Sequence, residues 1–283
     1  MPNLDRLRRV SLLLSCAALL TAGCRGGAVR QEVVRGASLS EVPDGAWQSL
    51  GTKRLFFGHQ SVGYNIMEGV GEVIRDNPRI GLRVAVGEAA LDSGGGVFAH
   101  GPIGRNGDPG LKTDEFARLI EGPLRGKVDV AFHKYCYADI AETTDVAAVF
   151  DHYQKTMARL RAEFPGVVFV HVTTPLVRVQ SGPKAAIKLL LGRSPGRYGS
   201  NFARERFNDL MRAAYRGREP VFDLATIEST RPEGARETIR SGNRSGYALV
   251  PAYTTDKSHL NELGRRRVAE ALLVFLARLP APK

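Results

Sequence analysis

Short apolar runs alternate with amphipathic segments along most of the chain, from about residue 46 onward. The runs are rich in Val, Phe and Leu, which is typical of strands buried on both faces, whereas the amphipathic segments predict helices. Strands are expected at residues 54–57, 82–86, 128–132, 167–173 and 221–223. Helices are expected at residues 62–77, 113–122, 144–164, 201–216 and 261–279. This alternation predicts an α/β fold, namely a flavodoxin-like three-layer α/β/α sandwich around a five-stranded parallel sheet.

Two long stretches interrupt the alternation. Residues 91–110 contain the glycine run Gly94, Gly95 and Gly96, and residues 181–199 combine Gly, Pro, Lys and Arg around an apolar centre. Loops of this length without secondary structure are uncommon unless they have a task. We therefore expect them to form lids or substrate walls.

The N-terminal residues have the pattern of an export signal. Three arginines precede an apolar segment at residues 10–20, which is far shorter than the roughly 20 residues that a membrane-spanning helix needs. Small residues then lead to Cys24, and this arrangement resembles a bacterial lipoprotein signal peptide. The resemblance implies that residues 1–23 are removed and that Cys24 carries the lipid (palmitate) anchor.

The same resemblance predicts where the protein resides. The residue after Cys24 is Arg25 rather than the Asp that favours inner-membrane retention, so an outer-membrane lipoprotein facing the periplasm is expected, or else a secreted or periplasmic protein. Residues 24–45 are polar and aperiodic and are predicted to form a tether. Residues 46–283 are then expected to form one folded domain.

Charge, cysteine and histidine content limit the kinds of partner, disulfide and cofactor that are expected. The net charge is +11, but the basic residues are scattered, without zinc-finger spacing or an aromatic-basic platform, so nucleic acid is not an expected partner. Of the three cysteines, Cys16 lies in the predicted signal and Cys24 is the predicted lipid site, which leaves Cys136 without a disulfide partner. His59, His133 and His171 have no metal-ligand spacing, so neither a metal nor another cofactor is expected.

The candidate chemistry lies at two distant places. Asp256 and His259 are three residues apart before the last predicted helix, close enough for the carboxylate to orient the imidazole. Ser61 follows the first predicted strand at a Gly-flanked turn, where a helix N-terminus stabilises developing negative charge. Each residue also has a structural interpretation: Ser61 as a helix N-cap, and His259 with Asp256 or Ser258 as a cap of the last helix.

In their combined order, these motifs resemble those of the SGNH (GDSL-like) hydrolases, over about residues 54–279. The block from Asp256 to Asn261, with Gly264, is a close match, whereas the sequence up to Ser61 has one residue more than Gly-Asp-Ser. The resemblance implies a Ser61 nucleophile, a His259 proton shuttle and an Asp256 orienting group. It also implies an oxyanion hole formed by the Ser61 N–H, a glycine N–H and an asparagine side chain.

For the glycine of that oxyanion hole, Gly94 and Gly95 are the natural candidates. The asparagine block departs from the family, because the chain reads His-Lys-Tyr-Cys-Tyr-Ala-Asp at residues 133–139. Lys134, Tyr137 or a backbone N–H are the possible substitutes. Cys136 is a rival nucleophile by chemistry, although a lone Cys at a strand end is usually a small buried residue.

The residues and the resemblance together predict an exported serine hydrolase that acts on an ester. Within the resemblance, small acyl esters on sugars or cell-envelope polysaccharides are the expected substrates. Two alternatives stay open. A non-catalytic glycan-binding module of the same fold would keep Ser61 as a cap, and an acyltransferase would use the same three residues with another acceptor.

Overall fold

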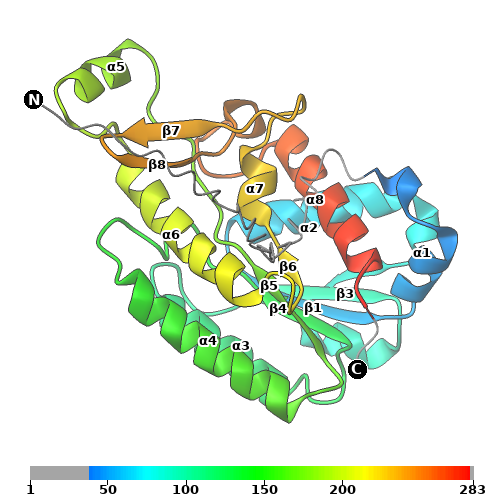
Figure 1. Cartoon of the computed structure of the whole chain (residues 1–283). Coiled ribbons are helices and arrows are strands. Elements are labelled where there is room, and N and C mark those ends of the chain that lie inside the picture. Colours follow the sequence, from blue (N-terminus) through cyan, green and yellow to red (C-terminus); the bar gives the residue numbers. More distant parts are fainter. Residues whose placement is uncertain (1–37, 281–283) are drawn as a thin grey trace, which may run out of the picture. The chain divides into compact units, whose positions relative to one another are not determined.

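The computed structural model describes residues 38–280 (Figure 1). The predicted signal peptide and the predicted lipidation of Cys24 lie outside the described residues and stay predictions. Within the described range, Val42 is already buried and is followed by helix α1 (Asp44–Leu50), so the packed chain starts before the predicted boundary at residue 46. No helix among residues 38–280 is long and apolar enough to cross a bilayer.

A parallel sheet of six strands lies at the centre, in the order β2-β3-β1-β4-β5-β6. The strands are β1 (Arg54–His59), β2 (Arg83–Val86), β3 (Val97–Pro102), β4 (Val130–His133), β5 (Val168–Val172) and β6 (Val221–Phe222). The predicted α/β class with a parallel sheet is confirmed. The predicted number of five strands is wrong, because β3 lies inside the stretch that was expected to be irregular.

Strand β3 escapes sequence-based prediction because its entry is built from glycine. A Cβ added at Gly95 would lie 2.4 Å from the Thr52 carbonyl oxygen, and Gly96 has a φ of +74°. The glycine run therefore lets the chain pass against the residues that precede β1, and it does so where side chains could not fit. It also removes the apolar side chains by which a strand start is normally recognised.

Helices cover both faces of the sheet, as Figure 1 shows. One face carries α1 (Asp44–Leu50), α2 (Val62–Asp76), α7 (Leu224–Ser229) and α8 (Glu262–Ala277). The other carries α3 (Pro109–Glu121), α4 (Val146–Glu163) and α6 (Tyr198–Tyr215). Each layer has its own buried apolar cluster against the sheet, which is the three-layer arrangement that the sequence predicts.

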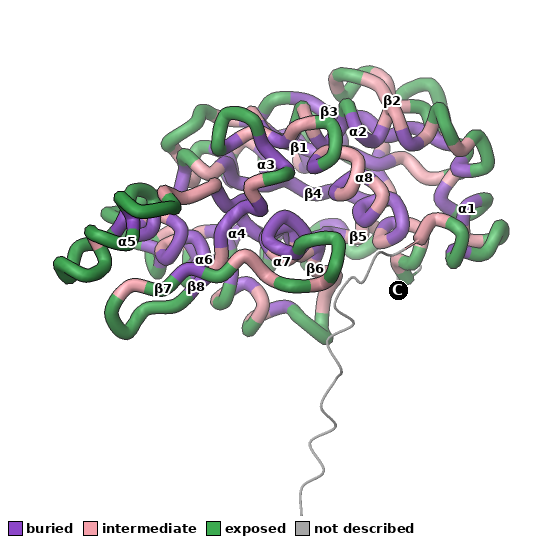
Figure 2. Tube along the Cα trace, turned by 90° about the horizontal axis from the view of Figure 1, so that it is seen from above, coloured by how far each residue is buried: buried purple, intermediate pink, exposed green. Residues whose placement is uncertain are grey.

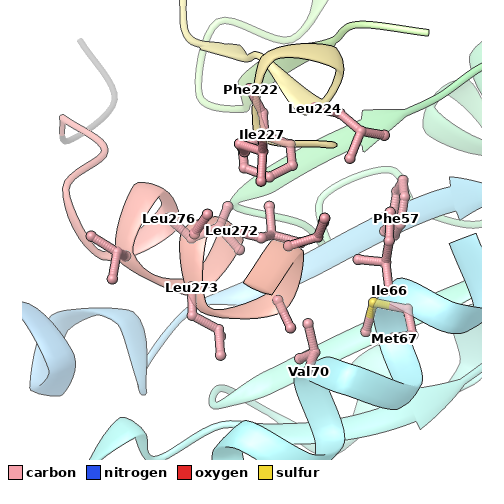
Figure 3. Packing of buried hydrophobic residues seen from close by; sticks show 14 of the residues in the cluster. Phe57, Ile66, Met67, Val70, Phe222, Leu224, Ile227, Leu272, Leu273 and Leu276 are labelled. Carbon is pink, nitrogen blue, oxygen red and sulfur yellow. The ribbon is translucent and has the colours of Figure 1, made fainter. Parts of the chain in front are cut away.

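Helices α2 and α8 pack closely against each other. A Cβ added at Gly69 of α2 would lie 2.7 Å from the Arg265 carbonyl oxygen of α8, so the two backbones approach where one has no side chain. Around this approach, Val70 of α2 and Leu273 of α8 lie in one buried cluster (Figure 3). Ser61 directly precedes α2 and His259 lies shortly before α8, so the helix packing brings the two ends together.

Helix α5 (Pro183–Leu190) and a small hairpin lie together beyond the end of α6 (Figure 1). Helix α5 occupies part of the second stretch that was expected to be irregular, so that expectation is wrong there. An antiparallel hairpin, β7 (Thr238–Ser241) and β8 (Arg244–Tyr247), forms a separate small sheet. Four short 3₁₀ helices complete the described chain: η1 (Leu39–Glu41), η2 (Pro78–Ile80), η3 (Glu88–Ser93) and η4 (Pro251–Tyr253).

Replacing Gly95 with Ala tests the close passage before β3. The new methyl group meets backbone rather than a movable side chain, so Gly95→Ala should lower the free energy of unfolding by about 1–3 kcal/mol. Gly71→Ala is the matched control: this helical position has open space around it, and the same change should raise stability by up to about 1 kcal/mol. Urea unfolding followed by circular dichroism measures both; equal effects would contradict the proposed crowding.

Candidate active site

The backbone at Ser61 adopts a conformation that L-residues rarely occupy. Its φ is 50° and its ψ is −111°, at the junction where β1 ends at His59 and α2 begins at Val62. A non-glycine residue with positive φ stores strain, and such residues cluster at functional sites. The Ser61 side chain makes no capping hydrogen bond to α2, so the N-cap interpretation is wrong.

Instead of capping the helix, Ser61 reaches His259, 198 residues further along the chain. Its Oγ lies 2.6 Å from His259 Nε2. On the other side of the ring, His259 Nδ1 lies 2.6 Å from Asp256 Oδ2. The two contacts form a continuous Ser-His-Asp line, with the imidazole between the hydroxyl and the carboxylate. The structure therefore brings together the three residues singled out from the sequence.

The loop that carries His259 is ordered by the Asp256 carboxylate. Asp256 Oδ1 accepts hydrogen bonds from the backbone N–H groups of Ser258 and His259, at 2.8 Å each. Burial opposes ionisation of Asp256, but these bonds and the one from the His259 ring outweigh it and hold the pKa of the carboxyl well below its ordinary value. The carboxylate is thus charged whenever the imidazole needs a partner.

The alternative in which this loop caps the last helix is not what the structure contains. Asn261 is the N-cap of α8 and accepts a hydrogen bond from the Gly264 N–H. Its side-chain amide also donates to the Ala252 carbonyl, which ties the start of α8 to the chain before Asp256. Neither Asp256 nor His259 is therefore needed as a cap, and their side chains bind each other instead.

The buried ring of His59 packs against the turn that carries Ser61. A Cβ added at Gly63 would lie 2.3 Å from the His59 ring, so the ring packs where only glycine fits. Burial, together with the nearby Lys134 ammonium, lowers the pKa of His59 to about 2, and the ring is therefore neutral. Its Nε2 lies 2.9 Å from His100 Nδ1. Within residues 38–280 no group of three or more His, Cys, Asp or Glu side chains is placed to hold a metal ion.

Lys134 lies directly behind the turn. Its Nζ donates to the Gln60 carbonyl oxygen at 3.0 Å, and Gln60 immediately precedes Ser61. The side chain is buried, and burial lowers the pKa of Lys134 to about 8 against the opposing influence of Cys136, Asp139 and Glu228. The sequence predicts Lys134 as a possible oxyanion donor, whereas in the structure its ammonium binds the backbone of the Ser61 turn.

Cys136 and Tyr137, which come shortly after Lys134, differ in whether their side chains reach the candidate site. The Tyr137 ring meets the His259 ring edge-on, with centroids 5.8 Å apart, and its carbonyl accepts two hydrogen bonds from the Arg204 guanidinium. Cys136 is fully buried, and its backbone N–H donates to Asp139. A buried thiol cannot reach a substrate, so Cys136 is not positioned as a rival nucleophile.

The predicted glycine donors lie at the wrong end of the sheet. Gly94 and Gly95 precede β3, and Gly95 lies beside Thr52, at the amino ends of β1 and β3, whereas Ser61 follows the carboxyl end of β1. A strand of this length spans roughly 20 Å, so neither N–H can reach the Ser61 site. The prediction is wrong because the most conspicuous glycine run marks the entry of a strand that the sequence analysis missed.

The loop after β3 occupies the place expected for such donors. The Gln60 side-chain amide donates to the carbonyls of Ile103 and Gly104, at 3.3 and 3.1 Å, which fixes this loop to the residue before Ser61. In the same loop, Asn106 Oδ1 accepts a hydrogen bond from Lys112. Recognising β3 would have drawn attention to Asn106, since it follows the carboxyl end of that strand.

A buried polar clamp, also missed from the sequence, holds the segment after β5. Asn208 binds both the N–H and the carbonyl of Thr174, and Asn201 does the same for Val177. Between them, Glu228 accepts from the Leu176 N–H at 2.9 Å. Side chains thus satisfy backbone groups that no strand or helix pairs. The helix-face spacing of Asn201 and Asn208 was visible in the sequence, but their partners were not.

No family model matches the chain, and no curated protein does. A member of the lipolytic protein G-D-S-L family from Veillonella parvula DSM 2008 is 14% identical, with a TM-score of 0.44 over 80% of this chain and 98% of that one. A G-D-S-L family lipolytic protein from Desulfitobacterium hafniense DCB-2 is 10% identical, with a TM-score of 0.45 over 79% and 99%. A peptidoglycan O-acetylesterase is 13% identical, with a TM-score of 0.42 over 63% and 45%. Likenesses at this level assign no function, which must come from the site's geometry.

Titration of Glu228 should make the stability of the folded protein depend on pH. Burial raises the pKa of Glu228 from 4.5 to about 8, although the Leu176 N–H, Lys134 and Arg204 favour its charged form. Between these two values the folded state binds more protons than the unfolded state, so stability should fall as pH rises from 4.5 toward 8. Glu228→Gln keeps an acceptor for Leu176 and cannot titrate, so its urea midpoint should lose this slope.

The control for this measurement is Glu228→Leu, which removes the acceptor. It cannot titrate either, but it leaves the Leu176 N–H buried and unpaired, so it should be about 1–3 kcal/mol less stable than Glu228→Gln at every pH. A Glu228→Gln variant whose stability declines with pH as steeply as the wild type would show that Glu228 is not the titrating group.

Proposed function

We propose that this protein is a serine hydrolase of the SGNH type that cleaves a carboxylic ester. The observation that carries the proposal is the Ser61–His259–Asp256 line, with 2.6 Å contacts on both sides of the imidazole. An imidazole in this position serves as general base for a hydroxyl, while the carboxylate fixes its tautomer and stabilises the imidazolium that forms. The strained backbone at Ser61 is a second support, because it holds the hydroxyl out from the helix.

In the reaction, the Ser61 Oγ attacks the ester carbonyl carbon while its proton passes to His259 Nε2. The tetrahedral adduct then collapses, the ester C–O bond breaks, and the leaving alcohol takes that proton from His259. Water adds to the acyl-enzyme by the same route in reverse, with His259 as base, and releases the acid with Ser61 restored. Asp256 stays ionised throughout, in keeping with its lowered pKa.

Two sources of oxyanion donors fit this geometry. Among residues 38–280 the Ser61 N–H has no acceptor and lies at the start of α2, where the helix dipole favours negative charge. The loop after β3, fixed by Gln60, is the second source. Asn106 is exposed and directs its Oδ1 to Lys112, which leaves its Nδ2 for a substrate oxygen. In the family, the asparagine donor belongs to the block that corresponds to residues 133–139, after β4. We propose that Asn106, after β3, takes its part here.

The openness of the site supports an ester carried on a large polar molecule. The side chains of His259 and Asp256 are 40% and 52% exposed, so a substituent that projects from a polymer can reach Ser61 without threading a tunnel. Small acyl groups on sugars or cell-envelope polysaccharides are therefore the proposed substrates. The proposed location in the cell envelope depends on the N-terminal sequence pattern alone.

Two observations favour catalysis over the non-catalytic glycan-binding alternative. That alternative keeps Ser61 as a helix cap, and the Ser61 side chain makes no capping bond. A binding module also gains nothing from a strained serine backbone or from a carboxylate that orients a histidine.

Ser61→Ala tests the proposed nucleophile. Hydrolysis of p-nitrophenyl acetate by the variant should fall at least about 10³-fold in kcat, because the covalent step is lost. Labelling by a fluorophosphonate probe should vanish as well. Ser49→Ala is the matched control, since Ser49 is an exposed serine on α1 far along the sheet from the site. A folded wild type that neither turns over the ester nor takes the probe would refute the proposal.

Asn106→Asp tests the proposed oxyanion donor. The change keeps an oxygen for Lys112 but removes the amide donor, so kcat should fall by roughly 10²–10³ while KM changes little. Thermal unfolding of the variant provides the control, and the midpoint should match the wild type because Asn106 is exposed. Wild-type kcat in this variant would assign the oxyanion hole to other groups.

A further inference from the structure

Helix α5 presents apolar side chains to solvent. Ile187, Leu190 and Leu191 are 57%, 87% and 64% exposed, and their spacing of three and four residues puts them on one face of the helix. Leu189 adds a further partly exposed side chain. Figure 1 shows α5 projecting beyond the end of α6 beside β7, and Figure 2 shows it largely exposed. We call Ile187, Leu189, Leu190 and Leu191 the α5 apolar face.

The α5 apolar face stands on a folded base rather than on a loose loop. The Gln180 N–H donates to the Gly196 carbonyl, and the Gln180 side-chain oxygen accepts from the Gly196 N–H and from Lys188. These bonds close the neck of the segment. Beyond the neck, Val179 and Tyr198 pack in a small apolar cluster with the β7–β8 hairpin. The exposure of the leucines is therefore a feature of an ordered element.

Basic side chains accompany this face, and acidic ones are absent from the segment. No Asp or Glu occurs between Glu163 and Glu205, whereas Lys184, Lys188 and Arg193 flank the apolar face in sequence. From the neighbouring hairpin, Arg240 adds another positive charge. Two carboxylates on neighbouring elements have arginine partners of their own: Glu237 pairs with Arg231, and Glu142 lies 3.9 Å from Arg244. The combination of protruding leucines with unopposed positive charge complements an anionic lipid surface.

We propose that the α5 apolar face, with Lys184 and Arg193, docks the protein on the surface of a bilayer that contains anionic lipid. The leucines enter the boundary between headgroups and acyl chains, and the basic side chains meet the phosphates. A surface of this kind needs no deep pocket, and an eight-residue helix is long enough to lie in the interface plane.

The docked segment is connected to the candidate active site. The Arg178 N–H donates to the Lys257 carbonyl, and the Arg197 side chain donates to the same carbonyl and to Ser258 Oγ. The two arginines flank the neck that Gln180 and Gly196 close, and Lys257 and Ser258 lie between Asp256 and His259. Docking through α5 thus sets the distance of the site's rim from the bilayer. The inference does not depend on the proposed hydrolysis, because membrane binding is measured without turnover.

Vesicle co-sedimentation tests the docking. A fragment of residues 34–283 is suitable, because it contains the whole described core of residues 38–280 and lacks the N-terminal apolar segment. It should bind vesicles of phosphatidylglycerol and phosphatidylcholine, and not vesicles of phosphatidylcholine alone. Leu190→Ser with Leu191→Ser, and separately Lys184→Glu with Arg193→Glu, should each weaken this binding at least about tenfold.

The matched controls are exposed residues away from α5. Val86→Ser removes an apolar side chain that is 74% exposed, and Arg218→Glu reverses an exposed charge; neither should alter vesicle binding. All the substituted side chains are exposed, so thermal unfolding should match the wild type in each variant. Leu190→Trp provides a direct reporter, because the chain's single tryptophan, Trp47, is buried. Its emission should shift to the blue only with the anionic vesicles.

Three results would overturn the proposal. The fragment would fail to bind anionic vesicles, or the α5 variants would bind them as tightly as the wild type. Alternatively, light scattering would detect a dimer that Leu190→Ser with Leu191→Ser dissociates while vesicles are not bound, and the occupant of α5 would then be a second copy of the chain.

Discussion

The backbone turn at Ser61 is the constraint on which the candidate site depends. A positive φ at a serine persists only where the surroundings hold it, and here they hold it from three sides. The His59 ring fills the space beside Gly63, the Lys134 ammonium binds the Gln60 carbonyl, and the Gln60 amide binds the loop after β3. Each of these contacts is made by a residue within the turn or at a neighbouring strand end. These contacts hold the strained backbone of Ser61 in place and so fix the direction of its hydroxyl.

Helix packing then determines what that hydroxyl meets. The close approach of α2 and α8 at Gly69 sets the separation of their N-terminal ends, and Ser61 and His259 lie at these ends. Apolar burial between the two helices is non-directional, so it cannot by itself orient an imidazole. Orientation comes from the Asp256 carboxylate, which binds the ring and two backbone N–H groups of its own loop. Packing supplies proximity, and hydrogen bonds supply direction.

How far the sequence leads can be judged from the same residues. The Ser61, Asp256 and His259 trio could be predicted, because strand-turn-helix patterns and a three-residue Asp-to-His spacing are local signals. Strand β3 could not, since the glycines that admit it beside Thr52 erase the apolar pattern of a strand start. Because β3 was missed, the glycine donors of the oxyanion hole were predicted at Gly94 and Gly95, which lie at the far end of the sheet. The clamp formed by Asn201, Asn208 and Glu228 was equally hidden, because a buried polar side chain is recognised only with its backbone partner.

The buried polar groups behind the site are costly to stability, and their arrangement indicates why they are kept. Lys134 and Glu228 are both buried, and burial moves the pKa of each to about 8 from opposite directions. An apolar pair of the same volume would pack without this desolvation cost. It could not, however, bind the Gln60 carbonyl on one side and the Leu176 N–H on the other. Those two backbone groups lie in the irregular segments that follow β1 and β5, where no strand pairing exists to hold them. The two polar side chains therefore bind, in these segments, backbone groups of the kind that strand pairing binds within the sheet.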